Sequence, residues 1–230
     1  MYNFLTAFSV FLALHMVPAW PTLRQRLITL LGRRAYFGIY SLLSIVALIW
    51  VFQAALALDF IPLWEPAPWQ AWTTFVLAPF GLLLVLAGLF SENPLSISIF
   101  QGNERKGAIV SVTRHPVLWG FLLWALGHVI ANGDLRSLVL FGSFALFAFG
   151  GFFMVEKRAR RRLGEKWPAA GQGTSIWPFV AILRGQAPLR ADPVMILSAF
   201  ATAAITFWLL AGGHYVMFGA DPLLQALPFD

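Results

Sequence analysis

The chain has 230 residues, of which 59% are hydrophobic and 11% are charged, and its mean hydropathy is +0.75. Because soluble domains carry about 25% charged residues, this composition excludes an ordinary soluble globular domain. In a soluble protein the net charge of +6 would suggest a nucleic-acid partner. Here the basic residues lie between apolar runs, where they set membrane topology and contact anionic headgroups, so we expect no nucleic-acid partner.

Six apolar runs follow one another along the chain, each close to the roughly 20 residues that cross a bilayer. They comprise residues 3–20, 36–58, 72–90, 116–131, 135–155 and 193–213. We therefore predict an all-α membrane bundle of about six transmembrane helices that forms a single domain over residues 1–230. The N-terminus lacks the basic region and the small-residue cleavage site of a signal peptide, so the first run is interpreted as a retained span.

Polar segments of distinct character connect these runs. The first run ends at Pro18 and Pro21 and is followed by Arg24, Arg26, Arg33 and Arg34. The polar segment 91–115 is expected to hold a short interfacial helix or a re-entrant piece. A tight Asn-Gly-Asp turn at 132–134 makes run 135–155 the antiparallel neighbour of run 116–131. That helix is expected to continue into water, where Glu156 and Arg160 are spaced i,i+4.

The charges of the connecting segments predict an orientation. If the first connecting segment is cytoplasmic, alternation places the third and the fifth there too, and these three carry every Lys and Arg except Arg136. The opposite side carries Asp59, Glu65, Asp134, Asp221 and Asp230. This positive-inside bias predicts six spans with both termini on the non-cytoplasmic side.

His15 is the first candidate for a functional residue, because an ionisable side chain at membrane depth is costly and marks functional sites. It lies in the first apolar run, about six residues before the cytoplasmic end. The same helical face carries Phe4, Phe8 and Phe11, and such an aromatic stripe suits a flat ring cofactor. The alternative is that the rings face lipid or a neighbouring helix and that His15 only forms a hydrogen bond between helices.

His128 is the second candidate, within the run 116–131. At helical spacing its face also carries Phe121, Trp124 and Asn132. Asn132 is expected to be the partner that fixes the imidazole tautomer of His128. The alternative is a hydrogen bond between helices near the outer interface.

A third group of candidates lies at the start of that helix. Thr113 is expected to be the N-cap, and Pro116 suits the first helical turn. Arg114, His115 and the exposed N–H groups of the helix start are expected to form an anion site for a lipid phosphate, a propionate or a cofactor carboxylate. The alternative is that these residues only cap the helix and reach toward the headgroups.

Two neutral imidazoles from different helices can ligate haem iron, which makes His15 and His128 candidate metal ligands. His115 cannot share one ion with His128, because about 20 Å of helix separates them. Counted from the cytoplasmic ends, His15 lies about 9 Å deep and His128 about 18 Å deep. Helix tilt, an offset span or a kink at Pro18 has to bring the pair to one level. His214, at the outer end of the last run, is interpreted as interfacial.

Several other chemistries lack their sequence signals. The chain contains no cysteine, which excludes disulfides, zinc–cysteine sites and thiol catalysis. It also has no dinucleotide-binding glycine motif after a strand, phosphate-binding loop, HExxH zinc motif or serine nucleophile elbow.

Several segments resemble the NnrU family of bacterial membrane proteins. They are His15-x-x-Pro18-Ala19, the segment from Leu23-Arg24 to Gly32, Tyr40-Ser41, and the long block TRHPVLWGFLLWALGHVIANGD at 113–134 with Glu156-Lys157 and the basic helix after it. The resemblance covers essentially the whole chain. It implies a multi-pass protein of the bacterial inner membrane, linked to nitric-oxide and nitrogen-oxide metabolism in denitrification, with a redox or nitrogen-oxide enzyme as partner.

The NnrU family is similar to the plant cis-zeta-carotene isomerases, which are haem b membrane enzymes. This similarity implies haem b as the cofactor and points to His15 and His128 as its axial ligands. Carotenoid isomerisation itself need not transfer, so a haem-dependent isomerase or oxidoreductase-like activity stays open.

The second half of the chain is also similar to isoprenylcysteine carboxyl methyltransferases. Arg114-His115-Pro116, Gly120 and Glu156 match parts of their S-adenosylmethionine-binding pattern. The chain departs from that pattern, because Lys157 stands where a second Glu is typical and Val117-Leu118 replaces the usual aromatic arrangement. A membrane methyltransferase is therefore the alternative function, and a non-catalytic assembly factor is a third.

Overall fold

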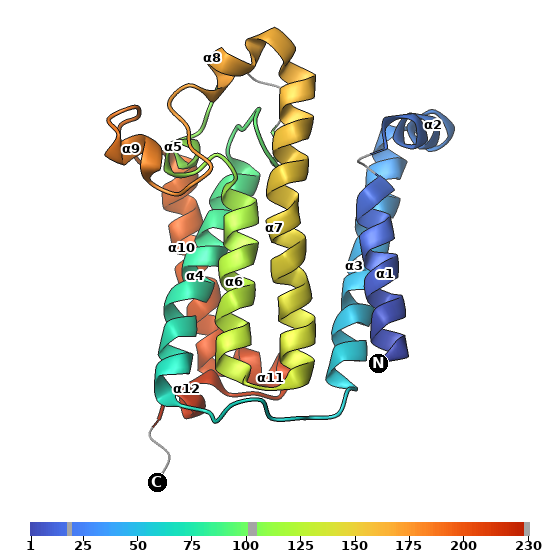
Figure 1. The fold of residues 1–230 in the computed structure, drawn as a ribbon, viewed down its shortest axis with the longest axis vertical. Coiled ribbons are helices and arrows are strands. Elements are labelled where there is room, and N and C mark those ends of the chain that lie inside the picture. The colour runs from blue at the N-terminus through green and yellow to red at the C-terminus, as the bar shows by residue number, and fades with distance from the viewer. Residues whose placement is uncertain (18–19, 101–104, 228–230) are drawn as a thin grey trace. The chain divides into compact units, whose positions relative to one another are not determined.

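The computed structural model describes residues 1–17, 20–100 and 105–227. Within these ranges the regular structure is helical, apart from an isolated antiparallel bridge between Pro62 and Asp134. The all-α prediction is therefore confirmed. The helices (Figure 1) are α1 (Tyr2–Met16), α2 (Pro21–Leu31), α3 (Arg33–Leu56), α4 (Pro68–Phe90), α5 (Ile109–Val112), α6 (Pro116–Asn132), α7 (Leu135–Leu163), α8 (Trp167–Gly171), α9 (Val180–Leu183), α10 (Pro193–Trp208), α11 (His214–Phe218) and α12 (Pro222–Gln225), with single turns η2 (Gly164–Lys166) and η3 (Leu209–Gly213).

Each of the six apolar runs forms a helix. Four helical stretches in the described residues are long and apolar enough to cross a membrane, namely Arg33–Leu56, Pro68–Phe90, Leu135–Gly171 and Pro193–Phe218. The other two runs form the shorter apolar helices α1, of 15 residues, and α6, of 17 residues. The chain is therefore built as a multi-pass membrane protein.

The N-terminal region differs from the sequence prediction in two ways. α1 ends at Met16, earlier than the expected end at residue 20, and Pro18 lies outside the described residues. The arginine-bearing stretch after it, expected to be a connecting segment, forms the separate helix α2. Proline in the first turn suits the start of this helix, and Gly32, with φ +79°, separates α2 from α3 because glycine tolerates a positive φ.

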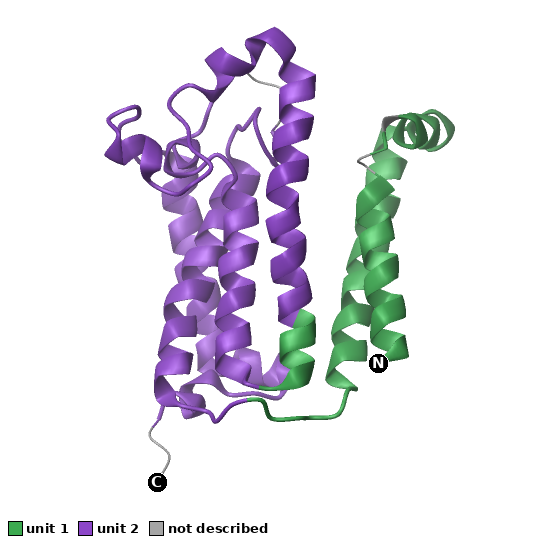
Figure 2. Cartoon of the chain, viewed as in Figure 1, with its two compact units in different colours: residues 1–63, 134–140 green, residues 64–133, 141–230 purple. Residues whose placement is uncertain are grey.

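The chain packs into two compact units (Figure 2). Unit 1 comprises residues 1–63 and 134–140, and unit 2 comprises residues 64–133 and 141–230. The single-domain organisation stays a prediction, and each unit is described by itself.

Unit 1 is built on the packing of α1 along α3. The buried side chains of α1 are Phe4, Ala7 and Phe11, whose spacing places them on one helical face. Near the N-terminus, Trp50 Nε1 donates a hydrogen bond to Asn3 Oδ1 at 3.1 Å. Unit 1 therefore holds an apolar helix pair with a polar contact at one end.

In unit 2, α4 and α6 approach each other closely because glycines face one another. A Cβ atom added to Gly81 would lie 2.6 Å from the Gly120 carbonyl oxygen, and one added to Gly88 would lie 2.7 Å from Pro116 Cγ. Thr74 Oγ1 also donates across the interface to the Gly127 carbonyl at 2.7 Å. Small residues allow such backbone contact in membranes, where close packing rather than the hydrophobic effect associates helices.

The antiparallel relation of α6 and α7 is confirmed. Gly133 adopts the left-handed conformation, with φ +63°, between the two helices. Within unit 2, the His128 ring lies 4.8 Å from the Phe141 ring, whereas the His115 ring lies 5.9 Å from the Phe152 ring. Early α7 thus packs against late α6, and later α7 packs against the start of α6.

One end of unit 2 carries a polar cap, formed by residues 91–100, 105–115 and 164–192. Figure 1 shows it as the loops and short helices above the helix ends. Asp192 fastens it, because Oδ1 accepts from the Met195 N–H at 2.9 Å, which caps α10, and Oδ2 accepts from the Ala108 N–H at 2.7 Å. The expected short helix of segment 91–115 is α5, a single buried turn within this cap.

Candidate functional site

A buried polar group joins α6 to α7 at the polar cap. His115 has no solvent exposure, and its Nε2 lies 3.0 Å from Glu156 Oε2. Its Nδ1 lies 2.8 Å from Ser96 Oγ. Because a carboxylate can only accept, Nε2 is the donor, and the serine hydroxyl can donate to Nδ1 of the neutral ring.

Arg114 completes this group from the neighbouring position. Its Nη1 donates to Glu156 Oε1 at 2.7 Å, and the two side chains are only 12% and 13% exposed. Arg160 binds the same Glu156 oxygen at 3.2 Å and provides the expected i,i+4 pair on α7. Glu156 is therefore the shared acceptor of one histidine and two arginines.

Glu156 lies beyond the apolar part of α7, at the first turn of its basic extension. Burial works to raise its pKa, but the hydrogen bond of His115, followed by the charge and hydrogen bond of Arg114, more than offsets burial and lowers the pKa to about 2. The carboxylate therefore stays ionised at physiological pH and balances a neighbouring guanidinium charge.

The loop after α8 is fastened to this group by backbone carbonyls. Thr113 Oγ1 and Trp119 Nε1 both donate to the Ile176 carbonyl, at 2.9 Å and 2.8 Å. The Arg114 N–H donates to the Ser175 carbonyl at 2.7 Å. Residues 174–176 thereby close the polar cap over the start of α6.

These contacts correct two expectations at the start of α6. Thr113 is not the N-cap, because α6 begins at Pro116 and its N-cap is His115. The Thr113 hydroxyl donates to the Ile176 carbonyl instead. The expected anion site at the helix start is closed, since His115 and Pro116 are fully buried and Val117 is 3% exposed. Pro116 and Val117 pack against Gly88 of α4. The position of Pro116 in the first turn is confirmed.

Arg114 instead borders an open hollow on the other side of the cap. The hollow has a volume of about 580 Å³ and is lined by Arg114, Trp167, Pro168, Ala169, Gly171 and Gln172. The sequence did not predict the residues that line this hollow beside Arg114, nor the contacts of Ser96 and Thr174. A polar residue in a connecting segment gives no signal of the tertiary contact that it makes, whereas Trp167 could have been singled out as an aromatic residue after a basic run.

His128 lies within α6 and is held by its own helix. Its Nδ1 donates to the Trp124 carbonyl at 2.8 Å, so Nε2 carries the lone pair of the neutral ring. The rings of Trp124 and Phe141 lie 5.0 Å and 4.8 Å from the imidazole. A metal-ligating histidine likewise donates through its second nitrogen to a carbonyl or carboxylate.

Asn132 does not play the expected part at this imidazole. Its Nδ2 donates to the backbone carbonyl of His128 at 2.7 Å, one turn back along α6. The tautomer of the ring is fixed instead by the Trp124 carbonyl.

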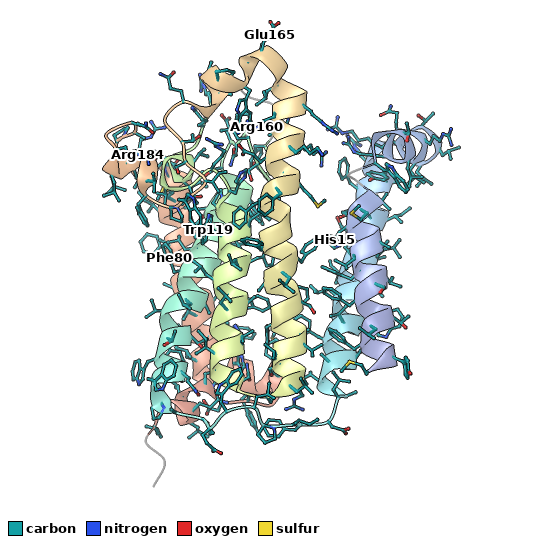
Figure 3. All side chains as sticks on the ribbon, in the orientation of Figure 1. His15, Phe80, Trp119, Arg160, Glu165 and Arg184 are labelled. Carbon is teal, nitrogen blue, oxygen red and sulfur yellow. The ribbon has the colours of Figure 1, made fainter. Side chains whose placement is uncertain are left out.

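His15 lies in the last turn of α1 in unit 1 (Figure 3), closer to the helix end than expected. Its Nδ1 donates to the Phe11 carbonyl at 2.8 Å, which gives it the same tautomer as His128. The Phe11 ring lies 4.1 Å and the Tyr40 ring 6.3 Å from the imidazole. The aromatic stripe is confirmed, since successive rings of Phe4, Phe8 and Phe11 stack along the helix.

The remaining metal chemistry is limited. The described residues contain no group of three or more His, Cys, Asp or Glu side chains that could hold a metal ion. His214 Nδ1 donates to the Ala220 carbonyl at 2.8 Å in the turn after α11. A metal bound by one or two histidines, as in a haem, is compatible with these findings.

The fold and these groups define an all-α, multi-pass membrane protein with histidines in its apolar helices and a polar cap at one end. A family model, described as NnrU protein, matches residues 3–222. The chain belongs to the NnrU family. Because the match spans both units, it covers His15 and His128 as well as the polar cap.

Two curated proteins from plants are more distantly similar. The chain is 30% identical over 122 residues to the chloroplastic 15-cis-zeta-carotene isomerase of Arabidopsis thaliana and 31% identical over 124 residues to that of Zea mays. In each case the match covers 53% of this chain and 32% of the relative, so it spans about a third of the curated proteins. No solved structure matches the chain significantly.

Proposed function

We propose that this NnrU family member is a haem b-binding protein of the bacterial inner membrane that acts in nitrogen-oxide metabolism. The observation that carries the proposal is that two histidines in apolar helices make the same hydrogen bond through Nδ1. Nδ1 of His15 and Nδ1 of His128 each donate to the carbonyl four residues earlier, so a metal would have to be bound through Nε2 of each ring. Haem is also the cofactor that the sequence resemblance described above implies.

The side chains around each histidine suit a flat apolar group. Trp124 and Phe141 pack beside His128, and Phe11 and Tyr40 pack beside His15. A haem with two axial histidines has no open coordination position and supports electron transfer or ligand exchange. The aromatic side chains would orient the imidazole rings and exclude water from the haem. A redox or nitrogen-oxide enzyme would be the partner of the protein.

An optical spectrum of the purified protein in neutral detergent, after expression with ample haem supply, tests this proposal. We expect a Soret band in the wild type, its loss in His15→Ala and in His128→Ala, and its retention in His214→Ala, which serves as the matched control. A wild-type spectrum without a Soret band contradicts the proposal. A band that survives both His15→Ala and His128→Ala contradicts the assigned ligands.

The proposal includes a topology of six spans with both termini outside the cytoplasm. Its support is that the basic connecting segments of unit 2 belong to one polar cap, where Lys106 donates to carbonyls of residues 170 and 172. Basic residues favour the cytoplasmic side, so the cap and the anionic headgroups would meet there. Reporter fusions after residues 63, 133 and 190 test the orientation: alkaline phosphatase should be active at 63 and 133, and green fluorescent protein at 190. The reverse pattern contradicts it.

A second candidate is an S-adenosylmethionine-dependent methyltransferase. The observation that favours it is that Arg114 and His115 both contact Glu156, which lies about 40 positions away in the chain and belongs to the same sequence pattern. Titration calorimetry with S-adenosylmethionine should then give binding that Arg114→Gln abolishes. Heats no larger than those of dilution leave haem binding as the single proposal.

A further inference from the structure

Arg114, which lines the hollow, has N–H groups that donate no hydrogen bond within the described part of the chain. Arg114 has five N–H groups, and three described hydrogen bonds engage Nε, Nη1 and Nη2, with Thr174 Oγ1, Glu156 Oε1 and the Thr174 carbonyl as acceptors. Nη1 and Nη2 each carry a second hydrogen. The side chain is 12% exposed and lines the hollow, so these nitrogens are held in place by buried contacts on one side.

Gly171 leaves Arg114 accessible from the hollow. A Cβ atom added to Gly171 would lie 3.8 Å from Arg114 Nη2, and it would meet no other heavy atom within 4 Å. Glycine at this position therefore keeps the guanidinium group of Arg114 accessible, because a larger side chain would extend over it. Gly171 does not have a positive φ, so other residues can adopt its backbone conformation.

The charges around the hollow leave a positive surplus. The guanidinium groups of Arg114 and Arg160 lie 5.2 Å and 4.9 Å from the Trp167 ring centroid and share Glu156. Lys106 Nζ donates hydrogen bonds to the carbonyls of residues 170 and 172, on either side of Gly171, at 3.0 Å and 2.6 Å. Among these described groups there are thus three cations and one carboxylate, that of Glu156.

The pKa of Lys106 is lowered mainly by burial and also by the neighbouring positive charge of Arg114. An anion bound in the hollow would stabilise the positive charges of both arginines and of Lys106, because an opposite charge within a few ångströms favours the charged form of each group.

We propose that the hollow between Arg114, Trp167 and Gly171 binds a phosphate group, carried by a lipid headgroup or by a free phosphate. A guanidinium group with two N–H groups to spare matches two phosphate oxygens. A volume of about 580 Å³ leaves room for the molecule that carries the phosphate. The site uses neither His15 nor His128, so it does not depend on haem.

Two arms of one experiment separate the sources of the phosphate. Titration calorimetry with inorganic phosphate, in neutral detergent at low salt, probes the free ion. Native mass spectrometry after incubation with phosphatidylglycerol, with phosphatidylcholine as the reference lipid, probes the headgroup. We expect at least one arm to show saturable binding by the wild type, and the arm that responds identifies the source.

Gly171→Leu covers the guanidinium group of Arg114 without removing a charge, and Gly150→Leu is its matched control on the apolar part of α7, where a Cβ would meet nothing within 4 Å. We expect Gly171→Leu to weaken phosphate or phosphatidylglycerol binding at least tenfold and Gly150→Leu to leave it unchanged. If Gly171→Leu does not fold, Arg160→Gln, at a side chain 60% exposed, serves instead and should weaken binding severalfold. Equal binding by wild type and variants, or no binding of either probe, overturns the proposal.

Discussion

His115 Nε2 lies 3.0 Å from Glu156 Oε2, although the two residues are 41 positions apart and the histidine is fully buried. This contact ties the start of α6 to the point where α7 leaves its apolar part. It also places an ionised carboxylate against a guanidinium group that is itself mostly buried. The consequences of this arrangement can be measured.

Glu156→Ala should destabilise the protein strongly. It removes the carboxylate that accepts from Arg114 Nη1 and His115 Nε2, and removing one partner of a buried pair typically costs about 3–5 kcal/mol. Thermal unfolding in detergent, followed by intrinsic fluorescence, should show a midpoint lowered by about 6 °C or more. Glu165→Ala, at an exposed position (Figure 3), is the control and should shift the midpoint by less than about 1 °C. Equal shifts in the two variants would show that the contact does not stabilise the fold.

The stabilisation by Glu156 should depend on pH in a defined direction. Its pKa is lowered from an ordinary value of 4.5 to about 2, so the folded state favours the ionised form. The stabilising contribution is therefore complete above pH 4.5 and is lost as the pH falls toward 2. The difference in unfolding midpoint between wild type and Glu156→Gln should stay constant from about pH 8 to 5 and shrink below about pH 4.5. A difference that grows on acidification would contradict the assigned direction.

Gly120→Leu should disrupt the packing of α4 on α6. The Gly120 backbone contacts that of Gly81 so closely that no side chain fits between them, and overpacking of this kind costs about 1–3 kcal/mol or more. We expect a lower yield of monodisperse protein on gel filtration and a reduced unfolding midpoint. Gly150→Leu, which meets open space, should behave as the wild type does. A well-folded Gly120→Leu would mean that the helices can separate without loss.

Asp192→Ala should loosen the polar cap, because one carboxylate both caps α10 and binds the Ala108 N–H. Loss of an N-cap costs about 1 kcal/mol, and the unsatisfied Ala108 N–H adds to this cost. Hydrogen exchange should speed up in residues 105–112 and in the first turn of α10. Asp221→Ala removes the cap of the short helix α12 and provides a comparison that should leave residues 105–112 unaffected. Unchanged exchange in Asp192→Ala would exclude this role.

The sequence by itself determined the class of protein, the six helical segments and the position of several helix ends. Apolar runs of near-bilayer length are local signals, and so are Pro116 in a first turn and the glycine at 133. The same locality explains the success with the i,i+4 pair of Glu156 and Arg160. A pattern that repeats within one helix can be read without knowing its neighbours.

Only the tertiary structure decided what the polar residues at the helix start do. The sequence suggested an anion site at Arg114 and His115, whereas in the structure His115 is fully buried and contacts Ser96 and Glu156. A side chain's partners depend on which segments meet in space, and the segments around 96, 156 and 174 are far apart in the chain. Arg114 therefore remains a candidate binding residue. Its exposed side lies in a hollow that Gly171 and Trp167 also line, and the sequence did not show this.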